Sequence, residues 1–184
     1  MSSNAHRAGS AHLPAWVRAI HAVSRALGVF AAGLILLSVA VVCQMVFTRA
    51  VLGQSSIWQT EFVTFSLVAA TFIGAPYIQL TRGHVAVDVW PIMAASGTRR
   101  WLHLTGYTLA LVFCALFFYA SLPWWHEAWE RTLTTPSIWR ARLWIPYLSL
   151  PVGLAVLCLQ FCAEIWLVYT GRELPFGLEP KGAA

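Results

Sequence analysis

Charged residues are absent from four long apolar windows in this chain. The windows are 20 to 26 residues long and cover Ala26–Thr48, Phe62–Thr81, Trp101–His126 and Leu143–Ala163. A helix needs about 20 apolar residues to cross the roughly 30 Å hydrocarbon layer of a bilayer. A water-soluble core has no need for four such windows. The pattern therefore predicts an all-α, polytopic membrane protein with four transmembrane helices.

The windows and their polar borders predict the domain organisation. We expect transmembrane helices over residues 26–48, 58–81, 101–123 and 143–169, within one domain over 26–171. Residues 1–12 are predicted to be disordered, and residues 172–184 to be a cytoplasmic tail. No segment repeats with a period of 20–50 residues. The break expected at Pro76 near the inner end of the second window does not correspond to the kinks expected at Pro146 and Pro151 in the outer half of the fourth. Many carriers are built from two repeated halves, so the pattern does not favour a self-sufficient carrier.

A helical stripe of apolar residues precedes the first window, opposite Arg18, His21 and Arg25. Its members are Leu13, Trp16, Val17, Ile20, Val23 and Leu27. A short helix with one apolar and one basic face is typical of the membrane interface. We therefore predict a separate amphipathic helix over residues 13–25, with Trp16 towards the hydrocarbon and Arg18 and Arg25 towards lipid phosphates. Docking to a partner's cytosolic loop is the alternative.

Composition and charge support the membrane assignment. Apolar residues make up 59% of the chain and charged residues 10%, against about 25% charged in an average soluble domain. The net charge is +5, but the basic residues are scattered along the chain, which excludes a nucleic-acid-binding domain. Lys and Arg accumulate in cytoplasmic loops. Both termini are predicted to be cytoplasmic, because eight of the twelve basic residues then lie inside.

The residues of catalytic and metal sites do not form a recognisable pattern. All four cysteines lie inside predicted spans, where a disulfide framework is not expected. Cys158 and Cys162 share a helix face, but packing explains them better than a metal pair. No phosphate loop, nucleophile elbow or zinc-protease motif occurs. We therefore predict no enzyme activity, no metal and no cofactor.

Glu61 is the one acidic residue near the outer end of the second window, one turn after Trp58. It could form a proton or cation site, or it could bond to Arg49, to a tryptophan indole or to a partner chain. The second interpretation is favoured, because a proton relay needs another ionisable group in mid-span.

Small residues recur every fourth position in two windows, as is typical of helix–helix contacts in lipid. The two stripes are Ser66, Ala70 and Gly74, and Gly106, Ala110 and Cys114. They could pack against each other or against another subunit.

The second window and the segment after it resemble the small membrane subunit of TRAP (tripartite ATP-independent periplasmic) transporters, the DctQ-like family. Three motifs carry the resemblance, in order: Trp58-Gln59-Thr60-Glu61, Gly74-Ala75, and Arg82-Gly83-His84-Val85-Ala86-Val87-Asp88. The resemblance extends over roughly residues 15–170.

The resemblance implies a complex of three proteins in a bacterial inner membrane, which performs sodium-coupled symport. A periplasmic substrate-binding protein captures an organic acid, often a C4-dicarboxylate, sialic acid or another carboxylate. A large multi-span permease subunit holds the substrate and sodium sites and moves by an elevator-type mechanism. The small subunit braces the immobile scaffold of the large one and helps to dock the binding protein.

On this basis three groups of residues are candidates for contacts. The subunit-interface candidates are Trp58, Glu61, Ser66, Ala70, Gly74, Arg82, His84 and Asp88. The candidates for docking the binding protein are Trp124, Trp125, Glu127, Glu130, Arg131, Trp139 and Arg140. The lipid-interface candidates are Trp16, Arg18 and Arg25.

The alternative from a different class is a haem- or quinone-linked membrane anchor subunit of a respiratory enzyme. His84 and His103 lie near neighbouring span ends and could be imagined as two axial haem ligands. Haem in such subunits needs ligands within the hydrocarbon, and both histidines are expected at the interface. A channel would require a polar stripe, and Gln44, Gln79 and Gln160 are too isolated to make one.

Overall fold

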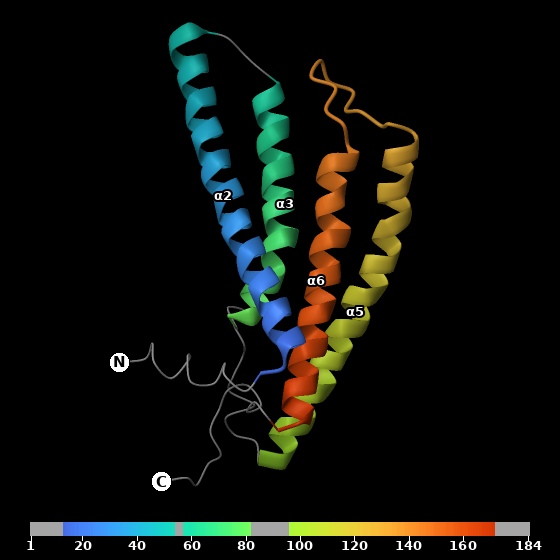
Figure 1. The fold of residues 1–184 in the computed structure, drawn as a ribbon. Coiled ribbons are helices and arrows are strands. Elements are labelled where there is room, and N and C mark those ends of the chain that lie inside the picture. Colours follow the sequence, from blue (N-terminus) through green and yellow to red (C-terminus); the bar gives the residue numbers. More distant parts are fainter. Residues whose placement is uncertain (1–12, 54–56, 82–95, 172–184) are drawn as a thin grey trace, which may run out of the picture.

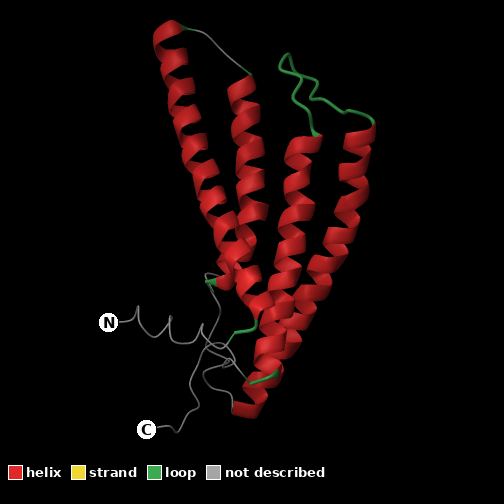
Figure 2. Ribbon diagram, in the orientation of Figure 1, coloured by secondary structure: helices red, strands yellow, loops and turns green. Residues whose placement is uncertain are grey.

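The described part of the chain folds into four long helices, as the apolar windows predict. The computed structural model describes residues 13–53, 57–81 and 96–171. The helices are α2 (Ala15–Leu52), α3 (Trp58–Leu80), α5 (Ser96–Glu130) and α6 (Trp144–Tyr169), shown in Figures 1 and 2. All four are long and apolar enough to cross a membrane, which confirms the four-span, all-α prediction. The tails predicted over 1–12 and 172–184, and the residues 82–95, lie outside the described ranges.

Helix α6 is the central element of the bundle. It packs against α2, α3 and α5, while α2 also packs along α3. The beginning of α2 and the end of α6 lie together at one end of the bundle, where the four helices converge (Figure 1). We call this the terminal end. The helices spread towards the opposite end, which carries residues 131–143 and is called the loop end below (Figure 2).

The separate interfacial helix predicted over residues 13–25 does not occur. Instead α2 runs without a break for 38 residues, from Pro14 at its N-cap to Gly53, whose positive φ of 61° ends it. The predicted apolar stripe is partly covered by protein: Val17 is fully buried against Ala163 and Leu167 of α6, and Leu13 and Ile20 are half-buried beside it, while Trp16 and Val23 remain exposed. The stripe and the following span share one helical phase, and no helix breaker lies between them, so the two segments form a single helix.

The second and fourth spans are also unbroken. Pro76 lies inside α3 and Pro151 lies inside α6, and both helices continue to their inner ends. Proline removes one backbone hydrogen bond, but neighbouring helices make this tolerable in a membrane. The break expected at Pro76 is therefore absent, while the kinks expected at Pro146 and Pro151 stay a prediction.

Two glycines allow close helix contacts. A Cβ atom added at Gly153 of α6 would lie 2.6 Å from the carbonyl carbon of Phe72 in α3, and one at Gly28 of α2 would lie 2.7 Å from Cβ of Tyr77 in α3. Both distances are too short for real atoms, so only glycine fits. In a membrane, such close backbone approach is a main source of helix–helix attraction.

Candidate functional site

A partly buried amide pair joins α2 and α3 near the loop end. Gln59 is 2% exposed, and its Nε2 donates a hydrogen bond to Oε1 of Gln44 at 3.2 Å. A buried amide with a partner on a neighbouring helix fixes the register of that helix pair. This pair positions the first turn of α3, where the candidate residues Trp58 and Glu61 lie.

The carboxylate of Glu61 is not neutralised within the described part of the chain. Its Oε2 atom is buried and has no hydrogen-bond partner there. The ion pairs among the described residues are His126–Glu130 and Glu127–Arg131, so Arg49 does not pair with Glu61. The first turn of α3 favours a negative charge through the helix dipole. Of the partners proposed from the sequence, a cation on another chain is the one still open.

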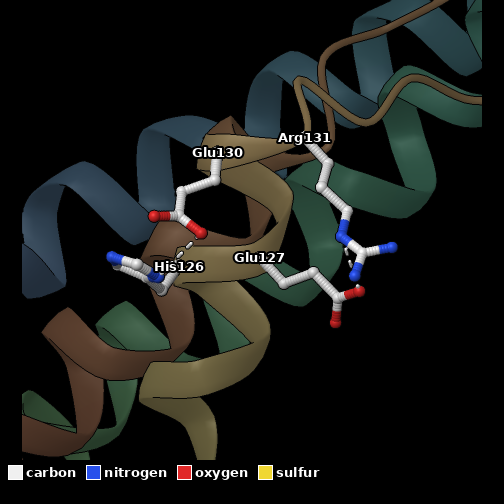
Figure 3. Close-up of polar contacts among 4 residues, drawn as sticks. All are labelled: His126, Glu127, Glu130 and Arg131. Carbon is white, nitrogen blue, oxygen red and sulfur yellow. Dashed lines mark ion pairs between the residues drawn. The ribbon is translucent and has the colours of Figure 1, made fainter.

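The loop end of α5 carries two ion pairs side by side (Figure 3). His126 Nδ1 lies 3.6 Å from Oε2 of Glu130, and Arg131 Nε lies 3.3 Å from Oε1 of Glu127. All four side chains are more than half exposed, so these pairs contribute little to stability. They leave charges of both signs available on the surface at this end.

Tryptophan pairs join α5 to α6 and attach the connection after α5 to α3. Trp129 packs edge-on against Trp144 with ring centroids 4.7 Å apart, and Trp58 lies 6.5 Å from Trp139. Trp124 remains 73% exposed. The aromatic candidates from α3, α5 and the connection therefore all lie at the loop end.

The connection between α5 and α6 is ordered by its own hydrogen bonds. Thr134 and Arg142 form an isolated antiparallel β-bridge, and the amide of Thr135 donates to the carbonyl of Ala141 at 3.0 Å. Arg140 has a positive φ of 50°, which is uncommon for a residue with a side chain. The connection thus holds Trp139 and Arg140 in a defined place above α3 and α6.

The small-residue stripe of α3 is covered by this chain itself. Ser66, Ala70 and Gly74 are all buried, and a Cβ on Gly74 would lie 3.3 Å from the Cβ of Ala31 in α2. The sequence left two possibilities, contact with the second stripe, which lies on α5, or contact with another subunit; the structure instead places Gly74 against α2 of the same chain. Because they are buried within this chain, we no longer count these three residues as candidates for contact with another subunit.

A buried polar layer near the terminal end was not predicted. Ser24 of α2 donates to Oε1 of Gln160 of α6 at 3.2 Å, and Gln160 is fully buried. One turn further along α6, Glu164 is 3% exposed. The signal was present as two polar residues spaced i, i+4 in an apolar helix, but their burial depends on how three helices align.

His103 belongs to the same region. It is 1% exposed and stacks on Tyr107 with ring centroids 4.0 Å apart, and Tyr107 packs edge-on against Phe161 of α6. The other histidine considered for haem, His84, lies outside the described residues, as do Arg82 and Asp88. Among the described residues, no three His, Cys, Asp or Glu side chains are grouped as a metal site.

The lipid-interface candidates have different surroundings in the structure. Arg18 and Arg25 are exposed on the first turns of α2. Trp16 is 43% exposed, but its ring packs edge-on against Trp166 of α6 with centroids 5.3 Å apart. Trp16 is therefore partly a helix–helix contact.

Comparison with known proteins gives two findings. The family described as "Tripartite ATP-independent periplasmic transporters, DctQ component" matches residues 38–171. The "C4-dicarboxylate TRAP transporter small permease protein DctQ" of Vibrio cholerae serotype O1 is 25% identical over 148 residues, which cover 69% of this chain and 64% of that protein. The matched region thus spans less than two thirds of the length of this relative.

Proposed function

This chain belongs to the DctQ component family of tripartite ATP-independent periplasmic transporters, and from this premise we propose that it braces the scaffold of a large multi-span permease subunit. In the same proposal it helps to dock a periplasmic substrate-binding protein during sodium-coupled uptake of an organic acid. The family match over residues 38–171 is the observation that carries the proposal. The family is that of a transporter component and not of an enzyme, so a respiratory anchor subunit is not proposed further.

The proposed topology places both termini in the cytoplasm of a bacterium and the loop end in the periplasm. Support comes from the distribution of basic residues, eight of which then lie inside. The exposed Arg18 and Arg25 of α2 would contact the phosphates of the cytoplasmic leaflet. We retain this role for the two arginines, with Trp16 as a flanking contact to α6.

A wide exposed surface supports the role of a brace. Among the described side chains of α5, only His103, Ser121 and Ala128 are buried. A helix that is hydrophobic over most of its circumference must be covered by lipid or by another protein. In the proposal, the large subunit covers part of this surface.

Trp58 and Glu61 are the proposed subunit contacts at the loop end. Trp58 is 39% exposed, and Glu61 lacks a cationic partner in the described part of the chain. A carboxylate at the edge of the hydrocarbon is costly unless it is paired or hydrated. We propose that a Lys or Arg of the large subunit pairs with it. Arg82, His84 and Asp88 are retained as candidates for contacts on the cytoplasmic side.

The binding protein is proposed to dock on the loop end of α5 and the following connection. The two exposed ion pairs there offer charges of both signs, and Trp124 offers an exposed ring. Weak, reversible protein contacts are commonly of this mixed polar and aromatic kind. The proposed docking residues are Trp124, Trp125, Glu127, Glu130, Arg131, Trp139 and Arg140.

The name of the Vibrio relative refers to a C4-dicarboxylate transporter. A C4-dicarboxylate is accordingly the first substrate to test, with other carboxylates next.

The first experiment is affinity purification of the tagged chain from native membranes in mild detergent, followed by mass spectrometry. We expect a large multi-span permease to be recovered with the chain. Recovery of flavin or iron–sulfur subunits, or of the chain alone, would contradict the proposal.

Glu61→Gln tests the proposed ion pair in the same experiment. It removes the charge and keeps the shape, so the amount of recovered permease should fall. Glu130→Gln is the matched control, since it removes an exposed charge at the same end of the bundle. Equal recovery with both variants would remove Glu61 from the interface but would leave the family assignment unchanged.

A further inference from the structure

An apolar groove opens at the loop end of the bundle. Two of the proposed docking residues, Trp139 and Arg140, line it, but its apolar interior is not explained by the proposed contacts. It has a volume of about 630 Å³ and is lined by side chains of α2, α3, α6 and the connection after α5. Phe30 of α2, Phe65 of α3 and Val152 of α6 are among its apolar walls. The volume is within the usual range of ligand sites, roughly 300–1,000 Å³.

The length of the groove matches one leaflet of a bilayer. Along α3 its lining extends from Phe62 to Ile73. At 1.5 Å per residue this is about 16 Å, close to half of the roughly 30 Å hydrocarbon layer. At its inner limit Gly153 brings α6 against the backbone of Phe72, which closes the groove. An extended chain entering from the loop end can therefore go no deeper than the middle of the membrane.

Two guanidinium groups belong to the mouth of the groove. Arg140 and Arg142 both line it, and both are exposed. Neither takes part in the ion pairs found within residues 13–53, 57–81 and 96–171, which are formed by other residues. The β-bridge between Thr134 and Arg142 fixes the backbone that carries them. Guanidinium groups bind phosphate oxygens in a fork geometry that lysine cannot reproduce.

We propose that this groove binds one phospholipid of the leaflet at the loop end. An acyl chain lies between α3 and α6, and the phosphate accepts hydrogen bonds from Arg140 and Arg142. The two arginines lie at the mouth of the groove and the apolar walls lie deeper. A phospholipid has the same order, with its phosphate at the membrane surface and its acyl chain below. A helix of a partner protein would satisfy the walls but would need its own carboxylates at its end to pair with the two cations.

The test is native mass spectrometry of the full chain, together with whatever permease co-purifies, in detergent with added palmitoyl-oleoyl phosphatidylglycerol. We expect one retained lipid for each copy of the chain. The double variant Arg140→Gln/Arg142→Gln should weaken retention by about tenfold, because the phosphate loses its two charged donors. Arg131→Gln is the matched control, since Arg131 is an exposed arginine at the same end but does not line the groove.

A second variant separates the acyl chain from the headgroup. Ala69→Phe fills the groove and keeps both arginines, so lipid retention should be lost while a free phosphate could still bind. Equal retention in the double arginine variant and in Arg131→Gln would overturn the proposal. It would also be overturned if no lipid is retained and a cysteine introduced at Ala69 cross-links to a partner subunit.

Discussion

The contact between Gly153 and the backbone of Phe72 gives the sharpest test of how the helices pack. In Gly153→Ala the new methyl carbon would lie 2.6 Å from the carbonyl carbon of Phe72 and 3.1 Å from the amide nitrogen of Ile73. A helix backbone cannot move aside as a flexible side chain can. The α3 and α6 helices must separate by about 1 Å to restore ordinary contact distances, and overpacking of this kind costs about 1–3 kcal/mol.

Gly106 of α5 is the matched control, since a Cβ added there has no atom within 4 Å. Gly106→Ala should be neutral or slightly stabilising, because alanine favours a helix more than glycine does. The assay is unfolding of the detergent-solubilised chain, followed by circular dichroism against temperature and against added SDS. The reasoning is refuted if Gly153→Ala unfolds at the same point as Gly106→Ala, or later.

Two further predictions concern polar contacts. Ser24→Ala removes the buried hydrogen bond to Gln160 and should destabilise the chain by about 1 kcal/mol. The control is Ser38→Ala, because Ser38 donates its hydrogen bond within its own helix. This control should have little effect in the same unfolding assay. Arg131→Ala should change stability by less than about 1 kcal/mol, because its ion pair with Glu127 is exposed. If the proposed docking surface is correct, the same variant should reduce uptake in reconstituted vesicles at limiting binding-protein concentration. Normal uptake at every concentration would exclude Arg131 from docking.

The fold could be predicted because a segment that crosses a lipid bilayer must be a long apolar helix. Four charge-free windows, each bordered by charged residues, leave few arrangements other than four spanning helices. The length of α2 was missed for a physical reason. The stripe around Val17 has the features of a surface-lying helix, but those same features suit packing on another helix, and in the structure α6 provides one.

The candidate contacts could be predicted less completely. The stripe of Ser66, Ala70 and Gly74 indicates a close helix contact, but a sequence does not state which helix makes it, and the structure assigns it to this chain. To predict the buried layer around Gln160, one must know how α2 and α6 are aligned along their axes. The spacing of residues within one helix does not give this alignment. The charges of Glu127 and Arg131 were recognised because they lie beside a predicted interface, and their role remains a prediction.

The close contact at Gly153 divides the α3–α6 seam into two parts with different mechanical roles. Towards the terminal end, Gln160 of α6 forms the polar layer with Ser24 of α2, and towards the loop end α3 and α6 diverge around the groove (Figure 1). Nine residues separate Gly153 from the start of α6 at Trp144, a lever of about 14 Å. Tilting the α5–α6 hairpin about this fulcrum would change the width of the groove and would shift Gln160, about 10 Å along α6 on the other side, in the opposite direction. A molecule seated in the groove would therefore act as a spacer that sets the angle between the two hairpins.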